Sequence, residues 1–241
     1  MAADRDAFNH DACNRAAALI DDADLRDLPD VAALQRDPRP RELRGKRAFD
    51  VLVAGVGLVL SAPAQVGIAA AVRLDSAGPV IFAQTRVGRF GRPFTILKFR
   101  TMTVSDAGRA GAVTGGADPR ITRVGAVLRA TKLDELPQLV NVLRGDMSLV
   151  GPRPEVPRYV RAWDPRLRPL ILAVRPGITD PASIAFRHEG RELAAVPDPQ
   201  AYYVRHLLPR KTALYADYVR GLSWRADLLV LARTARAVFS R

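Results

Sequence analysis

Two adjacent carboxylates, Asp134 and Glu135, stand at the head of a leucine-rich segment. An ionised carboxylate can act as a nucleophile or bind Mg²⁺, so the pair could serve a covalent or a metal-assisted reaction. A rigid Gly-Pro-Arg-Pro-Glu sequence follows at residues 151–155, and its arginine could hold a pyrophosphate. Helix capping is the alternative role, because a carboxylate at a helix N-terminus accepts backbone N–H groups and lies at the positive end of the helix dipole.

The leucine-rich segment predicts a helix that starts near Asp134. Pro137 fits only the first turn of such a helix, because proline has no N–H to donate. The apolar residues expected on one helix face are Leu133, Leu136, Leu139, Val140 and Leu143. We therefore expect both carboxylates at the N-terminal end of this helix.

Several cations lie near the two acids in the sequence. Lys98 and Arg100 project from one small region, and Arg129 and Lys132 precede the carboxylates. Taken alone, the pair Lys98 and Arg100 is usually a solvated surface. Arg129 and Lys132, close to the two acids, together with the arginine between prolines, favour chemistry at the carboxylates over simple capping. Short apolar runs at residues 79–84 and 93–99 predict strands or extended segments in the same region.

The composition limits the class of protein. The 241 residues can bury one sizeable core, so one catalytic domain with appendages is expected. An excess of 37 Lys and Arg over 25 Asp and Glu gives a net charge of +12, which attracts phosphate in nucleic acid, in a membrane surface or in a nucleotide. The single cysteine, Cys13, excludes an internal disulfide framework and a zinc site built from cysteines.

An apolar segment at residues 49–72 is long enough to cross a hydrocarbon layer about 30 Å thick. Pro63 lies near its middle and should bend the helix, and the Ser61 hydroxyl could satisfy a freed carbonyl. Basic residues flank both ends, which favours keeping both ends on the cytoplasmic side. The segment is therefore predicted to be a re-entrant helical hairpin, with a straight span or a buried core helix as alternatives.

The N-terminal residues differ in charge from the rest of the chain. Residues 1–45 hold ten acids and seven arginines, a net charge of −3, and end in a proline-bounded linker near residues 38–40. We expect an acidic, mobile appendage that the chemistry does not need. No apolar core follows a basic start, so no signal peptide is expected.

The part beyond residue 190 is expected to be helical, with one helix ending at Pro209. A later basic helix should either lie on a membrane surface or pack against the core, and its apolar stripe is Leu228, Leu231, Ala235 and Val238. The predicted fold is thus mainly α with short β segments: a re-entrant membrane helix hairpin plus a cytoplasmic catalytic domain with interfacial amphipathic helices. Its predicted parts are residues 1–45, the membrane helix 46–73 and the membrane-associated catalytic domain 74–241.

Four motifs in order behind the bent apolar segment carry a family resemblance. They are LDSAGPVIFAQTRVG at 74–88, KFRTM at 98–102, TRVGAVLRATKLDELPQLVNVLRGDMSLVGPRPE at 122–155 and RPGIT at 175–179. The chain resembles, over about residues 46–240, the bacterial sugar transferases known as monotopic polyprenyl-phosphate phosphoglycosyl transferases. The resemblance implies an enzyme that transfers a sugar-1-phosphate from a UDP-sugar to undecaprenyl phosphate and releases UMP, as the first membrane step of glycoconjugate or exopolysaccharide assembly.

The resemblance also implies roles for single residues. Asp134 matches the nucleophile that forms a covalent phosphosugar-aspartyl intermediate, and Glu135 matches the Mg²⁺ ligand. The positions expected to bind substrate are Lys98, Arg100, Arg129, Pro152, Arg153, Pro154 and Arg187. The expected partners are the UDP-sugar, undecaprenyl phosphate and membrane lipid, with a possible homodimer and no nucleic acid. The expected location is the bacterial inner (cytoplasmic) membrane, held monotopically on its cytoplasmic face.

The sequence departs from the family pattern at two places. Ala62 separates Ser61 from Pro63 where the family commonly has adjacent Ser-Pro, and residues 180–183 read Asp-Pro-Ala-Ser where many members have Gly-Trp-Ala-Gln. The second change lies in a loop expected to touch the substrate, so the sugar does not follow from the sequence. The oligomeric state, the role of residues 1–45 and the glycan pathway do not follow either.

Two other functions compete with this interpretation. A membrane-anchored nucleotide-binding or scaffold protein without turnover would explain the apolar segment and the charge, but it leaves the Asp134–Glu135 pair unexplained. A basic nucleic-acid binder would need an exposed reader helix or an aromatic stacking surface, which the apolar run and the 6% aromatic content do not favour.

Overall fold

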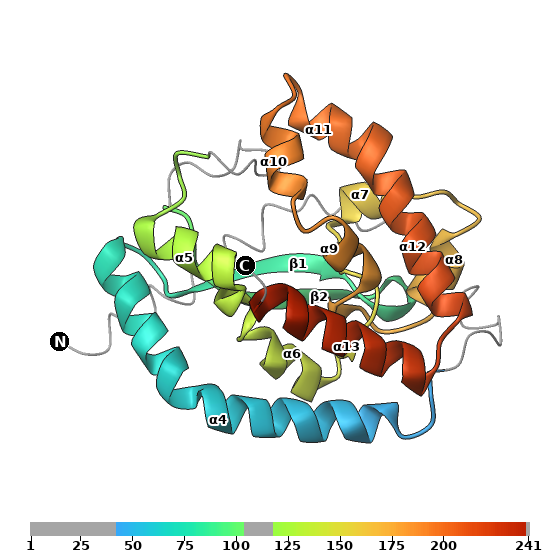
Figure 1. The fold of residues 1–241 in the computed structure, drawn as a ribbon, viewed down its shortest axis with the longest axis horizontal. Coiled ribbons are helices and arrows are strands. Elements are labelled where there is room, and N and C mark those ends of the chain that lie inside the picture. The colour runs from blue at the N-terminus through green and yellow to red at the C-terminus, as the bar shows by residue number, and fades with distance from the viewer. Residues whose placement is uncertain (1–41, 104–117, 240–241) are drawn as a thin grey trace.

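The computed structural model describes residues 42–103 and 118–239, and Figure 1 shows them as a mainly helical fold with short strands. The first half contains α4 (Lys46–Asp75), β1 (Ile81–Val87), the 3₁₀ turn η1 (Arg89–Gly91), β2 (Pro93–Phe99), α5 (Arg123–Thr131), the 3₁₀ turn η2 (Leu133–Glu135), α6 (Gln138–Arg144) and β3 (Ser148–Val150). The second half contains α7 (Pro157–Arg161), α8 (Arg168–Leu172), β4 (Gly177–Thr179), α9 (Pro181–Ala185), α10 (Glu189–Ala194), α11 (Pro199–Tyr202), the π-helical turn η3 (Tyr203–Leu207), α12 (Leu208–Arg220) and α13 (Trp224–Phe239). The predicted fold class, mainly α with short β segments, is confirmed.

The apolar segment forms one continuous helix, α4, that runs along an edge of the molecule and bends partway (Figure 1). In the described part of the chain it is the one helix that is long and apolar enough to cross a membrane. Its large side chains face outward: Val59 is 74% exposed, Leu60 76% and Val66 71%. This exposure excludes the alternative of a buried core helix, whereas a chain that turns back on itself is not seen in α4.

The Ser61 hydroxyl does not donate to the backbone carbonyl that Pro63 leaves without an N–H donor. Pro63 lies inside α4 and has no N–H to donate to the carbonyl of residue 59. Ser61 instead donates to the Gly57 carbonyl at 2.6 Å and accepts from the Gln65 amide at 2.8 Å. These contacts keep both polar side chains satisfied inside an apolar helix, so Ser61 supports the bend from the turn before it.

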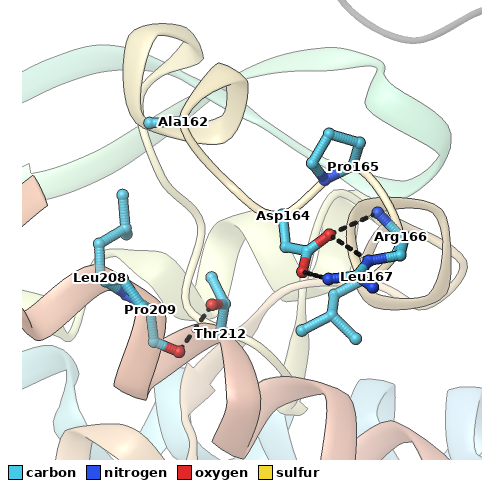
Figure 2. Close-up of a pocket in the computed structure, with 8 residues that line it drawn as sticks. All are labelled: Ala162, Asp164, Pro165, Arg166, Leu167, Leu208, Pro209 and Thr212. Carbon is cyan, nitrogen blue, oxygen red and sulfur yellow. Dashed lines mark hydrogen bonds and ion pairs between the residues drawn. The ribbon is translucent and has the colours of Figure 1, made fainter. Parts of the chain in front are cut away.

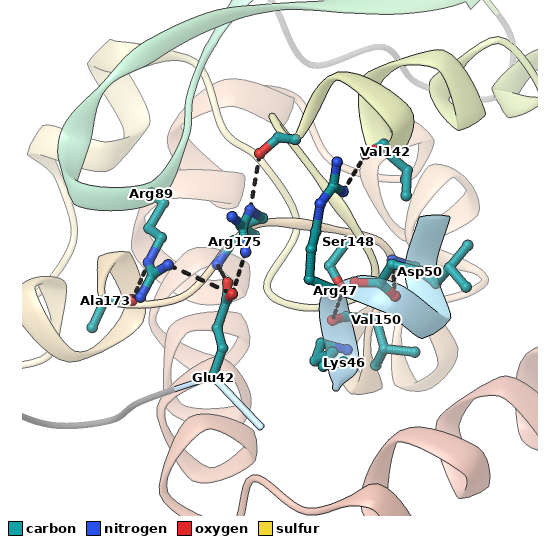
Figure 3. Close-up of polar contacts among 12 residues, drawn as sticks. Glu42, Lys46, Arg47, Asp50, Arg89, Val142, Ser148, Val150, Ala173 and Arg175 are labelled. Atoms are coloured by element: carbon teal, nitrogen blue, oxygen red, sulfur yellow. Dashed lines mark hydrogen bonds and ion pairs between the residues drawn. The ribbon is translucent and has the colours of Figure 1, made fainter. Parts of the chain in front are cut away.

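The base of α4 is fixed to the rest of the domain by three polar side chains. Lys46 is buried and its Nζ lies 2.5 Å from Asp227 Oδ2 of α13. Arg47 donates to the carbonyl of Val142 at 2.5 Å (Figure 3) and to that of Leu143 at 3.0 Å, both at the end of α6. The buried Asp50 accepts the Leu149 N–H at 3.2 Å in β3 (Figure 3).

These contacts change what the basic flank of α4 means. Lys46 and Arg47 belong to the basic residues that precede the apolar segment, but both are engaged inside the protein. A charge count cannot show this, because Asp227 lies 181 residues along the chain from Lys46. Of the flanking arginines, Arg44 and Arg73 are exposed and remain available to a membrane surface.

A second contact fixes the chain just before α4. The Glu42 carboxylate accepts the Arg175 backbone N–H at 3.1 Å, pairs with the Arg175 guanidinium, and lies 3.5 Å from Arg89 Nη1 (Figure 3). Arg175 also donates to the Gly145 carbonyl at 2.9 Å. Glu42, the first of the described residues, therefore already contacts the domain, three residues before the predicted end of the appendage. The predicted linker and the acidic residues before it lie outside the described residues.

Two small sheets lie within the helical framework. β1 and β2 pair antiparallel from Ile81↔Phe99 to Val87↔Pro93, which confirms the strand expected at residues 93–99 and places the other at 81–87. β3 and β4 pair in parallel. Beside this second pair, a Cβ on Gly151 would lie 2.4 Å from the Arg175 carbonyl oxygen, so the Gly-Pro-Arg-Pro and Arg-Pro-Gly-Ile-Thr segments meet backbone to backbone.

The C-terminal helix packs against the core with one side and is exposed on the other. Asp227 and Val230 of α13 are buried, and Val230 belongs to a cluster with Leu149, Val150 and Val219. Of the predicted apolar stripe, Leu228 and Ala235 are exposed and Leu231 is half-buried, while the Val238 side chain lies outside the described residues. Core packing of α13 is thus confirmed, and contact of its outer side with a membrane stays a prediction.

The buried Lys46–Asp227 pair yields a stability prediction. Replacing Lys46 with Met leaves a buried carboxylate with Tyr218 as its remaining side-chain donor, at 2.6 Å. We expect the free energy of unfolding in detergent to fall by about 3–5 kcal/mol in Lys46→Met, and by clearly less than the sum of the single changes in Lys46→Met/Asp227→Asn. The exposed Arg44→Ala control should change it by less than about 0.5 kcal/mol. Additive single changes would show that the pair is not coupled.

The Glu42 contacts predict where truncation begins to destabilise the protein. Deleting residues 1–40 keeps Glu42 and should leave the free energy of unfolding within about 0.5 kcal/mol of the full chain. Deleting residues 1–45 removes the acceptor of two arginines and should cost about 2 kcal/mol, as should Glu42→Ala in the full chain. Thermal unfolding of the four proteins tests this, and equal stability of the two deletions would contradict it.

Candidate active site

The adjacent carboxylates lie in the turn η2, between α5 and α6. Lys132, with a φ of 61°, separates η2 from the end of α5. The predicted helix start near Asp134 is displaced, because α6 begins at Gln138 with Pro137 as its N-cap. Leu136 and Pro137 nevertheless have right-handed helical dihedrals, so the chain coils continuously from η2 into α6.

The apolar stripe of this segment is not its most buried face. Leu133 and Leu143 are 38% and 37% exposed, and Leu139 packs against Gly57 of α4. The fully buried side chains of α6 are Gln138, Asn141 and Val142. Leu133 and Leu143 therefore lie at the surface, Leu139 packs between α4 and the core, and the two amides of α6 are more deeply buried than any of these leucines.

Glu135 is held by two cations. Its Oε1 accepts from Lys98 Nζ of β2 at 2.8 Å and from Arg153 Nη2 at 3.0 Å. Burial alone would raise the pKa of Glu135, but the charges of Lys98 and Arg153 lower it by more, so its net pKa lies well below the ordinary value. Glu135 is thus an anion fixed between Lys98 and Arg153, two cations that the family resemblance predicts to bind the substrate.

Asp134 has a different environment although it is the next residue. It is 9% exposed, and its Oδ1 is buried without a hydrogen-bond partner among the described residues. Burial and the neighbouring charge of Glu135 raise its pKa. A poorly solvated carboxylate with a raised pKa is more basic than an ordinary one, so the two neighbours differ: Glu135 is held by cations and Asp134 is not hydrogen-bonded by any described residue.

Two more of the predicted substrate-binding residues, Arg153 and Arg129, lie in segments next to the carboxylates in the fold. Arg153 reaches the carboxylates from between the buried Pro152 and the buried Pro154, after β3. Arg129 lies half-buried in the last turn of α5, one turn before η2.

Arg100 contacts groups other than the carboxylate pair, and no ion pair joins Arg187 to those carboxylates among the described residues. The Arg100 guanidinium donates to the carbonyls of Ser76 and Ala77, both at 2.7 Å, and so closes the C-terminal end of α4. Arg187 is exposed after α9 and donates to His188 at 3.0 Å. A short-range cluster of cations in the sequence could not show that Arg100 points toward the membrane helix.

Two further residues of the site were missed. Asn141 accepts the Leu97 N–H at 3.0 Å and donates to the Thr95 carbonyl at 2.7 Å, which holds α6 against β2. Asp180 is fully buried, caps α9 by accepting the Ser183 N–H at 2.9 Å, and helps to raise the pKa of Arg153 after the larger effect of Glu135. The signal for Asn141 was a polar residue among leucines, and that for Asp180 was the departure from the family pattern.

The donors at the site fit a magnesium ion that is shared with a substrate. No group of three or more His, Cys, Asp or Glu side chains gathers within residues 42–103 and 118–239. Mg²⁺ is commonly held by one or two carboxylates together with substrate phosphates. Glu135 uses only Oε1 for its ion pairs, so Oε2 and the free Asp134 Oδ1 are the oxygens left for a metal or a phosphorus atom.

A cavity of about 580 Å³ lies elsewhere, at the start of α12 beside the segment between α7 and α8 (Figure 2). Its lining residues are Ala162, Asp164, Pro165, Arg166, Leu167, Leu208, Pro209 and Thr212. None of the predicted site residues is among them, so this cavity is separate from the carboxylate pair.

The structure combines an exposed apolar helix, long enough to cross a membrane, with a carboxylate pair of which Glu135 is bound by two cations. The sequence matches the family described as bacterial sugar transferase over residues 41–241. The chain belongs to the bacterial sugar transferase family.

Three relatives show how far the similarity extends. The chain is 39% identical to a UDP-glucose:undecaprenyl-phosphate glucose-1-phosphate transferase of Caulobacter vibrioides, over 84% of this chain and 73% of the relative. It is 36% identical to a UDP-N-acetylgalactosamine-undecaprenyl-phosphate N-acetylgalactosaminephosphotransferase of Aeromonas hydrophila, over 81% of this chain and 44% of the relative. It is 37% identical to the exopolysaccharide production protein ExoY of Rhizobium meliloti, over 83% of this chain and 88% of that protein.

Proposed function

We propose that this protein transfers a sugar-1-phosphate from a UDP-sugar to undecaprenyl phosphate, with release of UMP, as the first membrane step of glycoconjugate or exopolysaccharide assembly. The observation that carries the proposal is the contrast between the partner-free Asp134 and the cation-bound Glu135. The names of the relatives support the substrates, since they pair UDP-sugars with undecaprenyl phosphate. The site chemistry supports an enzyme over a scaffold, which would have no use for a buried reactive carboxylate.

The proposed reaction has two displacements at one phosphorus atom. The Asp134 carboxylate attacks the sugar-bearing phosphorus, the bond from that phosphorus to the bridging oxygen breaks, and UMP leaves with the bridging oxygen. A phosphate oxygen of undecaprenyl phosphate then attacks the same phosphorus, which frees the carboxylate and leaves the sugar on a lipid diphosphate. The raised pKa of Asp134 favours its role as nucleophile in the first step.

The cations and the metal have separate proposed roles. Lys98 and Arg153 are placed to bind the diphosphate, and Arg153 suits it best because a guanidinium can bind phosphate through two N–H groups. Arg129 and Arg187 are proposed to contact phosphates at the rim of the site. Glu135 would hold Mg²⁺, which would supply neutralisation of charge on the departing UMP.

We also propose that α4 is re-entrant, with the catalytic domain on the cytoplasmic face. The exposed side chains of α4 support contact with lipid, and the bend at Pro63 supports a return to the same face. The exposed Arg44 and Arg73 still flank α4 after Lys46 and Arg47 are set aside. A reaction between a water-soluble UDP-sugar and a lipid phosphate needs a site at the membrane surface, which this arrangement provides. A homodimer stays a prediction.

Substitution of Asp134 and substitution of Glu135 should impair the reaction in different ways. Asp134→Asn cannot form an acyl phosphate, so intact-mass spectrometry after incubation with a UDP-sugar and no acceptor should show no sugar-phosphate adduct. Glu135→Gln should lower UMP release by about 100-fold or more and weaken its Mg²⁺ dependence. The wild-type adduct should disappear when undecaprenyl phosphate is added.

The exposed carboxylate of Asp217 offers a control, since Asp217→Asn should behave as wild type. Near-normal UMP release by Asp134→Asn would overturn the covalent mechanism; helix capping is not the alternative in the structure, because neither η2 nor α6 has a side-chain cap. No UMP release by the wild type with any UDP-sugar would favour the scaffold.

The topology of α4 is tested by cysteine labelling in a Cys13→Ala background. Arg44→Cys and Leu74→Cys place thiols at exposed positions on either side of α4, and Leu74 is 88% exposed. A re-entrant helix predicts that a membrane-impermeant maleimide labels neither site in intact cells and both after the membrane is permeabilised. Labelling of one of the two sites from outside would show a straight span.

A further inference from the structure

Gln138 is a fully buried glutamine whose side chain has no hydrogen-bond partner among the described residues. It is 1% exposed, and its Nε2 is left unpaired. Most buried side-chain amides in folded proteins are hydrogen-bonded, and an unpaired one costs about 1–3 kcal/mol. The position is therefore poorly explained by stability, since an apolar side chain of the same length would avoid this cost.

The coiled path places Gln138 about one turn beyond the Asp134 carboxylate. Residues 133–144 coil without interruption, because Leu136 and Pro137 join η2 to α6 with helical dihedrals. The first backbone N–H groups of this path bond to carbonyls three residues back, so residues three apart lie on the same face, as in a 3₁₀-helix. Gln138 thus lies on the face of Glu135 and Asn141. Asp134 and Gln138 each carry a buried polar atom without a partner among the described residues: a carboxylate oxygen on Asp134 and an amide nitrogen on Gln138.

This face is fixed against β2, the strand that supplies Lys98. Asn141, one turn further along α6, bonds to the Thr95 carbonyl and the Leu97 N–H of that strand. Glu135, at the other end, bonds to Lys98. Gln138 lies between these two attachments, so its position is set by the helix and by its neighbours before any ligand binds.

A neutral donor has an advantage beside a nucleophilic carboxylate. A lysine or arginine at position 138, about one turn from Asp134, would place a positive charge near that carboxylate and would lower its nucleophilicity. An amide N–H adds no net charge and can still donate to an oxygen on which negative charge develops. The unpaired Nε2 therefore fits an oxygen of the group that Asp134 attacks.

We propose that Gln138 is a further catalytic residue, whose side-chain amide donates a hydrogen bond to a non-bridging oxygen of the phosphoryl group during its transfer to and from Asp134. The proposal rests on the proposed function. Gln138 gives up no proton and forms no covalent bond in either displacement. Loss of one such donor typically lowers turnover by about 100- to 1,000-fold.

Gln138→Met tests the donor, because methionine has a similar length and fills the same space without polar atoms. We expect single-turnover UMP release, measured without acceptor from UDP-glucose or UDP-N-acetylgalactosamine, to slow by about 100-fold. The KM for the UDP-sugar should change by less than about threefold, and the thermal unfolding temperature should stay the same or rise, because an unpaired buried amide is removed. Gln200→Met, at an exposed glutamine, is the matched control and should leave both unchanged.

Two outcomes would overturn the role of Gln138. One is wild-type UMP release by Gln138→Met, and the other is a loss of UMP release that only parallels a fall in the unfolding temperature. The Asp134→Asn experiment distinguishes a wrong role for Gln138 from a wrong proposed function. If Asp134→Asn forms no adduct while Gln138→Met forms it at the wild-type rate, the covalent mechanism stands and the role of Gln138 does not.

Discussion

One carboxylate oxygen, Oε1 of Glu135, joins three segments that are far apart in the sequence. It binds Lys98 from β2 and Arg153 from the loop after β3, while Glu135 itself belongs to the turn before α6. Each cation alone would be costly to bury, and the shared anion offsets that cost for both. Because the two cations also keep the pKa of Glu135 low, the junction remains charged over the physiological pH range. The arrangement of the site depends on this junction.

The backbone supports the junction from both sides. Gly151 and Gly177 approach so closely that a Cβ on Gly177 would lie 2.1 Å from the Gly151 nitrogen, which fixes where the loop carrying Arg153 leaves the sheet. On the other side, Asn141 ties α6 to β2 through two backbone groups. The base of α4 is bonded to α6 and to β3, the strand that precedes this loop: Arg47 donates to a carbonyl of α6, and Asp50 accepts an N–H of β3. The orientation of the apolar helix is therefore coupled to the site through rigid elements.

The sequence predicted what depends on local pattern and on motif. The helical class, the strand at 93–99 and the cations Lys98 and Arg153 follow from spacing and resemblance, and the structure places both cations on Glu135. Long-range partners could not be predicted: Lys46 is neutralised by Asp227, and Arg100 closes α4. The burial of Gln138 was also hidden, because the leucines beside it predicted an apolar interior face, whereas in the structure they line α4 and the surface.

The geometry of the turn explains why two neighbouring acids have different surroundings. Successive residues of a helical turn project about 100–120° apart, so neighbours in sequence face different surroundings. Glu135 faces the two cations and becomes a weak base, whereas Asp134 faces the interior without a partner and becomes a stronger one. The charges of Lys98 and Arg153 also act on Asp134, but burial and the charge of Glu135 outweigh them there. The turn thus gives the two carboxylates different environments within a single peptide bond, and Gln138, about one turn later, adds a buried amide donor without adding a charge.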